Sequence, residues 1–272
     1  MATKAIVSSE KITAIANAIR FKTGSNDLIR IEDMPSQIEA IKTGIDTTNE
    51  DNIISRSFSD GVCVNDRVTT IGNYAFCGCS NLVEVYFPNV TSVGQYAFEG
   101  CKITEITSNN FPSLTKLNQH SFRACNSVIY VNLPKVAVIE AYAFNTSKNI
   151  IEAKFDNATS TGNRAFVANE RLKKVILPSM KSIEGLTFYQ CYSLTALILA
   201  SETVCTLKNT NAFQDSHHIL GTTNSTWNPN GNKDGYIYVP SSLVESYKTA
   251  TNWSTYASQI RAIEDYPEIT GG

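Results

Sequence analysis

Charge, histidine and long apolar segments are all scarce in this sequence. Of its 272 residues 18% are charged, below the roughly 25% typical of soluble domains, and the net charge is −2. No strong field of either sign is expected, which argues against nucleic-acid binding. The longest apolar runs cover only a few residues, so no membrane insertion is expected. Residues 1–20 are polar and lack the apolar core of a secretory signal.

A phenylalanine, usually preceded by a small residue, recurs along most of the chain. The series is Phe76, Phe98, Phe122, Phe144, Phe166, Phe188 and Phe213, and successive numbers differ by 22, 24, 22, 22, 22 and 25. Most copies have an apolar or small residue five positions earlier, and Cys, Ser or Asn three positions later. Near-equal steps of this size are typical of a solenoid built from stacked repeats.

Each repeat also contains a short alternating segment that ends in proline. In the first copy Val85 and Phe87 are expected to point inward, and Glu84 and Tyr86 outward, because neighbouring strand residues face opposite sides. One short strand cannot bury its apolar side alone, so stacked copies predict a parallel sheet over a continuous core. The proline is expected to end each strand, where a missing N–H matters least.

The pattern Cys-x-x-Leu-x-x-Val-x-Leu-Pro, with Ile-x-x-x-Ala-Phe nearby, resembles the BspA-like leucine-rich repeats of bacterial surface proteins over about residues 67–240. The resemblance implies a curved leucine-rich-repeat solenoid. Its parallel β-sheet would lie on the concave face, with short helical turns or irregular segments on the convex face. The family also implies adhesion or ligand binding, without fixing a ligand.

The two ends differ from the repeats. Residues 1–45 predict a helical segment, residues 46–66 a linker and N-terminal cap, and residues 241–272 a C-terminal helical cap. Ser241 and Ser242 can cap a helix that starts near Leu243. A polar stretch, residues 214–234, interrupts the last repeat before the strand-like Tyr236 to Val239.

Part of the N-terminal segment has a resemblance of its own. The run Ile12-x-x-Ile15-Ala16-x-Ala18-Ile19-Arg20-x-Lys22-Thr23-Gly24, followed by Asp33-Met34-Pro35-x-x-Ile38, resembles the start of tail or baseplate-associated proteins of phages and prophages. In that setting residues 1–45 would attach to phage structural proteins and the solenoid would be displayed on the virion. The alternative is a plain helical cap.

The cysteine and histidine residues that could act in catalysis or metal binding are interpreted as structural or surface residues. Cys79, Cys101 and Cys125 share one repeat position, which favours buried, reduced thiols over disulfides or a metal site. His120 takes an exterior position that is tyrosine in other copies. His217, His218 and Asp215 could form a hydrolase site, but a solvated polar loop is the favoured interpretation. No catalytic residue, metal or cofactor is therefore predicted.

The outward strand positions are the predicted ligand-binding surface. Read across the stack, they are acidic and aromatic first, then basic, then apolar, ending at Ile176 and Ile198. The predicted binding residues are Glu84, Tyr86, Glu105, Tyr130, Asn132, Glu152, Lys154, Lys174, Tyr236 and Tyr238. Tyrosine offers amphipathic surface to a protein or glycan on a cell surface. A tail-associated binder and a bacterial cell-surface adhesin both fit this pattern.

Overall fold

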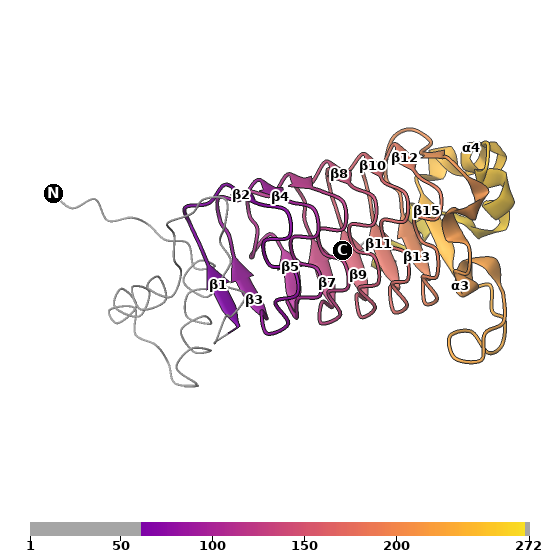
Figure 1. The fold of residues 1–272 in the computed structure, drawn as a ribbon. Coiled ribbons are helices and arrows are strands. Elements are labelled where there is room, and N and C mark those ends of the chain that lie inside the picture. The colour runs from indigo at the N-terminus through magenta and orange to yellow at the C-terminus, as the bar shows by residue number, and fades with distance from the viewer. Residues whose placement is uncertain (1–60, 270–272) are drawn as a thin grey trace.

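The computed structural model describes residues 61–269; the predicted helical segment 1–45 lies outside them. The chain coils into an elongated solenoid whose turns stack side by side, with a cap at the C-terminal end (Figure 1). Each turn contributes one longer strand to one side and one two-residue strand to another. We call these the broad side and the narrow side.

All strands on both sides pair in parallel. The broad strands are β1 (Val62–Val64), β3 (Glu84–Tyr86), β5 (Glu105–Thr107), β7 (Tyr130–Asn132), β9 (Glu152–Lys154), β11 (Lys174–Ile176), β13 (Ala196–Ile198), β15 (Tyr236–Val239) and β16 (Ile260–Ala262). The narrow strands are β2 (Thr70–Ile71), β4 (Ser92–Val93), β6 (Lys116–Leu117), β8 (Val138–Ile139), β10 (Ser160–Thr161), β12 (Ser182–Ile183) and β14 (Thr206–Leu207). The predicted solenoid and its parallel sheet are confirmed, and the narrow sheet is a feature that the sequence analysis did not predict.

The broad side consists of a seven-stranded sheet, β5 to β16, and the pair β1–β3, which continues its line (Figure 1). The break falls in the repeat that is two residues longer than most. There the Asn110 side chain donates to the Val85 carbonyl at 3.0 Å, in place of a backbone hydrogen bond between neighbouring strands. An amide side chain thus satisfies a backbone group that the extra residues would leave unpaired.

The core follows the repeat. Val85 and Phe87 are buried, as the alternation predicts, and β3 ends before Pro88. The repeated Phe rings form one continuous stack from Phe76 to Phe213, with neighbouring centroids 5.0–5.7 Å apart and planes within 14°. Each ring is therefore buried by the repeats before and after it, so a single repeat has no core of its own.

A ladder of side-chain donors runs beside the Phe stack. The residue three positions after each Phe donates to the carbonyl of the preceding repeat's Phe. The donors are Cys101, Cys125, Ser147, Asn169, Cys191 and Ser216, at 2.7–3.2 Å. All are buried, and the prediction of buried, reduced cysteines at this repeat position is borne out for Cys79, Cys101 and Cys125. Cys, Ser and Asn interchange here because each supplies a small donor to a buried carbonyl.

The C-terminal cap is made of short helices and one added strand. Its helices are η3 (Ser241–Leu243), α4 (Val244–Thr249), η4 (Trp253–Gln259), η5 (Ile263–Asp265) and η6 (Pro267–Ile269), whereas η2 (Thr210–Phe213) and α3 (His217–Leu220) belong to the last repeat. Helix α4 begins where predicted, but the expected serine cap is wrong: its N-cap is Leu243, without a side-chain hydrogen bond. The Ser241 hydroxyl instead donates to the Glu264 carboxylate at 3.1 Å.

Two aromatic side chains fix the cap to the last repeat. The indole N–H of Trp253 donates to the Cys205 carbonyl at 2.6 Å, and the Tyr247 hydroxyl accepts from the Cys205 N–H at 2.9 Å. Both rings are fully buried. The cap therefore closes the core and satisfies both backbone groups of Cys205.

Candidate functional site

The outward face of the broad side collects the predicted binding residues into two columns. The strands pair in register, so equivalent residues of successive repeats lie side by side: Tyr130 opposite Glu152, and Glu152 opposite Lys174. Asn132 and Lys154 are neighbours in the second column. The middle residue of each of these strands is buried, which leaves the flanking residues to form the surface.

The end of this face nearest β1 is acidic. Burial raises the pKa of the half-buried Glu84 carboxyl, and the negative charge of Glu105 on the next strand raises it further. The pKa of the Tyr86 hydroxyl is likewise raised by burial and by Asp66. Within residues 61–269 neither Glu84 nor Glu105 forms an ion pair. This end therefore holds carboxylates that a cationic or hydrogen-bonding ligand could satisfy.

The middle of the face exposes two large apolar side chains next to each other. Tyr130 is 53% exposed and Ile129, immediately before it, is 42% exposed. Tyr130 was predicted as a binding residue, whereas Ile129 was not, because Ile129 precedes the strand and lies outside the two columns. Exposed side chains of this size in adjacent positions are typical of contact surfaces.

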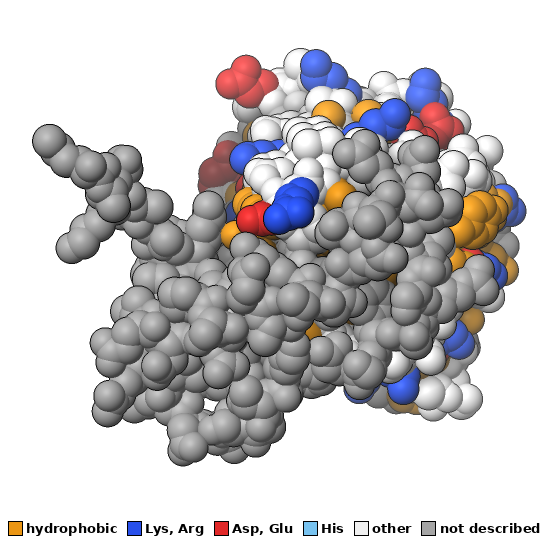
Figure 2. Space-filling view, turned by 60° about the vertical axis from the view of Figure 1, so that its left-hand side comes forward, with side chains coloured by type: hydrophobic (Ala, Val, Ile, Leu, Met, Phe, Trp, Pro, Cys, Tyr) orange, Lys and Arg blue, Asp and Glu red, His pale blue; other side chains and the backbone are white. Residues whose placement is uncertain are grey.

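The basic part of the face is largely neutralised by its neighbours. The Lys174 ammonium lies 3.7 Å from the Glu152 carboxylate, and that of Lys154 lies 3.4 Å from Asp156. On the face that Figure 2 shows, described side chains of both charge signs are interspersed. The ion pairs of Lys154 and Lys174 therefore give the basic part of the broad side mixed charge rather than a basic patch.

The end of the face near the cap is covered by the chain itself. Residues 263–269 pack across it with Ile263, Tyr266 and Ile269. Tyr238 is only 5% exposed, and its ring lies 5.3 Å from that of Tyr266. Tyr238 was predicted to bind ligand, but this burial removes it from the accessible surface.

Two other outward residues near the cap show the same effect. Ile198 is 1% exposed in the same cluster, because the apolar end of the column packs against residues 263–269. Tyr236 stays half-buried, with the Arg261 guanidinium 4.4 Å from its ring centroid. The accessible face therefore runs from β3 to β11.

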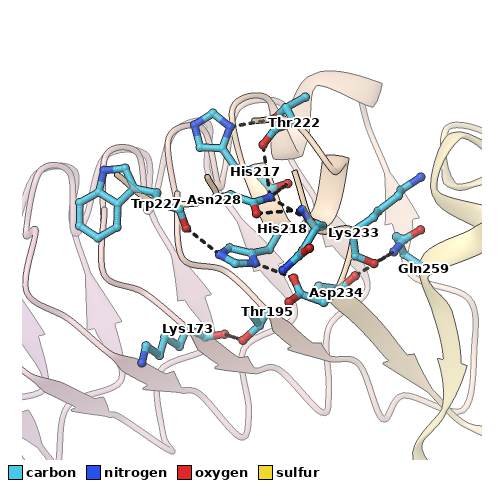
Figure 3. A network of polar contacts seen from close by, with 12 residues as sticks. Lys173, Thr195, His217, His218, Thr222, Trp227, Asn228, Lys233, Asp234 and Gln259 are labelled. Carbon is cyan, nitrogen blue, oxygen red and sulfur yellow. Dashed lines mark hydrogen bonds and ion pairs between the residues drawn. The ribbon is translucent and has the colours of Figure 1, made fainter. Parts of the chain in front are cut away.

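The two adjacent histidines belong to a structural network (Figure 3). The Nδ1 atom of His218 lies 2.6 Å from Asp234, and its Nε2 atom lies 3.1 Å from the Trp227 carbonyl oxygen. His217 contacts the Thr222 hydroxyl at 2.7 Å. Asp215, the partner considered for a hydrolase site, has no ion pair with either histidine in the described part of the chain.

The remaining polar residues give no metal site or membrane span. No group of three or more His, Cys, Asp or Glu within residues 61–269 is arranged to hold a metal ion. Among the same residues no helix is long and apolar enough to cross a membrane. His120, expected at the exterior, lies in a stack between Tyr96 and Tyr142, with ring centroids 4.3 and 4.6 Å away.

A model of the BspA type leucine rich repeat region matches residues 55–166 and 105–220, which together are more than half of the chain. The chain belongs to the BspA-type leucine-rich-repeat family. The match includes the whole accessible face from β3 to β11 and stops before the inserted loop and the cap. A comparison with curated proteins gives no match.

Solved structures of leucine-rich-repeat proteins share this fold. A leucine-rich cell surface protein from Faecalibacterium prausnitzii is 24% identical, with a TM-score of 0.50, over 58% of this chain and 45% of that one. The T. pallidum leucine-rich-repeat protein is 22% identical, with a TM-score of 0.51, over 60% of this chain and 79% of that one. This BspA-type chain thus spans less than half of the first protein, and both likenesses concern the fold alone.

Proposed function

We propose that this chain is a non-enzymatic binding or adhesion protein whose ligand contacts the outward face between β3 and β11. The observation that carries the proposal is the surface around Tyr130. Its ring and the Ile129 side chain are exposed although neither is needed by the core. The carboxylates of Glu84 and Glu105, which form no ion pair with any residue between 61 and 269, lie on the same face. Aromatic, aliphatic and acidic groups together suit a protein or glycan on a cell surface.

The distribution of polar side chains supports binding over catalysis. The buried thiols serve the donor ladder, and the histidines at 217 and 218 hold a loop. Burial raises the pKa of the Cys125 thiol, which keeps it protonated and unreactive. The proposal that the protein is not an enzyme rests on these structural roles.

The binding face can be tested with paired substitutions. The purified chain would be probed against immobilised extracellular proteins and glycans, and its best-bound partner titrated. We expect Tyr130→Ala to weaken that binding about tenfold, because exposed aromatic residues dominate many interfaces. The matched control is Val138→Thr, an exposed position on the narrow side. Equal losses in both variants, or no loss in Tyr130→Ala, would contradict the proposal.

The alternative setting is a phage or prophage tail, with the solenoid as the displayed binder. Its support is the resemblance of residues 12–38 to tail-associated proteins; the family match begins at residue 55 and does not reach that segment. Negative-stain images of induced particles, labelled with an antibody to the solenoid, would test it. Unlabelled particles would exclude this setting and leave the cell-surface setting in place.

A further inference from the structure

The last repeat carries a long insertion that the other repeats lack. Elsewhere the chain passes from the buried donor to the next broad strand within a few residues, as from Cys191 to Ala196. Here it passes from Ser216 to Tyr236. The added segment, residues 221–235, follows α3. Loops of this length in compact folds are usually functional.

Hydrogen bonds in this loop centre on Asn228 and hold the backbone of the preceding residue, Trp227, in place (Figure 3). The Asn224 side chain accepts from the Trp227 N–H at 3.0 Å, and the ring of His218 contacts the Trp227 carbonyl. The next residue, Asn228, is 1% exposed. Its amide donates to the carbonyls of His217, Thr222 and Asn232, at 3.2, 3.2 and 2.8 Å. The backbone of Trp227 is therefore held on both sides.

The Trp227 side chain is not used to build the core. It is partly exposed, and its indole N–H has no hydrogen-bond partner within residues 61–269. Its ring neighbour there is Tyr192, with centroids 5.8 Å apart. The other tryptophan, Trp253, is fully buried and its N–H is satisfied by the Cys205 carbonyl. Among the described residues, the loop thus presents an aromatic ring face and an indole N–H that no other group uses.

Polar groups from preceding repeats flank this aromatic face. Tyr192 lies at the edge where turns lead into the broad strands, and its other ring neighbour is His217, at 5.2 Å. The pKa of the Tyr192 hydroxyl is raised by burial first, then by the charges of Glu170 and Asp215, so it remains a donor. Beside it the Glu170 carboxylate pairs with the Lys148 ammonium at 2.7 Å.

We propose that Trp227 and Tyr192, with the flanking Glu170–Lys148 pair, form a saccharide-binding subsite. A sugar ring has an apolar C–H face that stacks on an aromatic ring, and hydroxyls that hydrogen-bond to N–H, O–H and carboxylate groups. An aromatic face with several hydrogen-bonding groups around it fits a sugar better than an aliphatic side chain. The hydrogen bonds that fix the loop reduce the entropic cost of binding. This subsite is separate from the outward face around Tyr130 and does not depend on the function proposed for that face.

A glycan array probed with the full chain tests the subsite. The best-bound oligosaccharide would then be titrated by tryptophan fluorescence, because Trp227 is the partly exposed one of the two tryptophans. We expect Trp227→Ala and Tyr192→Ala each to weaken binding about tenfold or more, as at an interface hot spot. The matched control is Tyr74→Ala, at an exposed tyrosine that belongs to neither binding surface, and it should leave saccharide affinity unchanged.

The role of the loop can be separated from that of the rings. His218→Ala should weaken binding while shifting the emission of Trp227, because it removes a contact that positions this residue. Far-UV circular dichroism should stay unchanged in Trp227→Ala, since Trp253 and the core are untouched. The proposal is overturned if no glycan binds the intact chain or if Trp227→Ala binds as well as the parent.

Two further outcomes distinguish this subsite from the proposed binding face. Loss of saccharide binding in Tyr130→Ala but not in Trp227→Ala would place the sugar on the broad side and overturn the subsite. Binding of an unglycosylated protein through Trp227, without any glycan, would overturn the assignment of a saccharide.

Discussion

Replacement of Ser147 by alanine tests the donor ladder that links successive repeats. The Ser147 hydroxyl donates to the Phe122 carbonyl at 2.8 Å and accepts from the Cys125 N–H at 3.1 Å, and Ser147 is fully buried. Alanine leaves both backbone groups unsatisfied in the core. Each such group costs about 1–3 kcal/mol. The alanine variant no longer has to bury a polar hydroxyl, which offsets part of the cost of the two unsatisfied backbone groups. We therefore expect the free energy of unfolding to fall by about 2–4 kcal/mol.

The assay is urea denaturation followed by far-UV circular dichroism. The matched control is Ser147→Cys, because Cys125 and Cys191 occupy the same repeat position and donate to the equivalent carbonyls at 3.0 and 3.2 Å. The cysteine variant should stay within about 1 kcal/mol of the parent. An alanine variant within about 0.5 kcal/mol of the parent would refute the reasoning, since that is the range of ordinary surface substitutions.

The other predictions concern the ring stack, the exterior histidine and the thiols. Phe144→Ala should cost about 3–5 kcal/mol in urea denaturation, because Phe144 is fully buried in the stack. Burial, then Arg123, lowers the pKa of His120. Because the pKa of His120 is lower in the folded chain than in the unfolded chain, folding favours the neutral imidazole. The neutral imidazole therefore contributes stability above about pH 6.5, and this contribution is lost as the pH falls through the pKa of the folded chain. His120→Tyr should therefore reduce the loss of stability between about pH 7.5 and about pH 5; an unchanged loss would contradict this. Burial raises the pKa of Cys205 to about 12, so a disulfide reagent should modify this thiol only after unfolding; modification at full rate in the folded chain would refute its inertness.

The repeat predicted the broad side because its residues alternate over a long enough segment. Val85, Phe87 and Pro88 have the positions that the pattern implies. The narrow strands escaped prediction because two residues, such as Ser92 and Val93, are too few to show a period of two. Their buried members were recognised only as the apolar residue five positions before each Phe.

The candidate site was predictable only where it repeats. The outward positions of Glu84 and Tyr130 follow from the alternation of inward and outward residues along a strand. The burial of Tyr238 instead comes from residues 263–269, which follow the last repeat and have no counterpart in the repeats. Tyr192 and Trp227 are 35 positions apart, and a polar loop of unknown course gives no reason to bring them together. Contacts of this kind depend on tertiary packing and leave no periodic signal.

The regularity of the solenoid makes its exceptions informative. In a stack of equivalent turns each position has one structural task, such as the donor to the preceding Phe carbonyl, and neighbouring repeats show which residues can perform it. Ile129 and Tyr130 depart from this rule because they are large, apolar and exposed where the core gains nothing from them. Trp227 departs from it because hydrogen bonds fix its backbone in the loop, while its indole N–H has no hydrogen-bond partner among residues 61–269. Neither departure follows from the need to stack repeats, so both are where ligand contacts should be sought first.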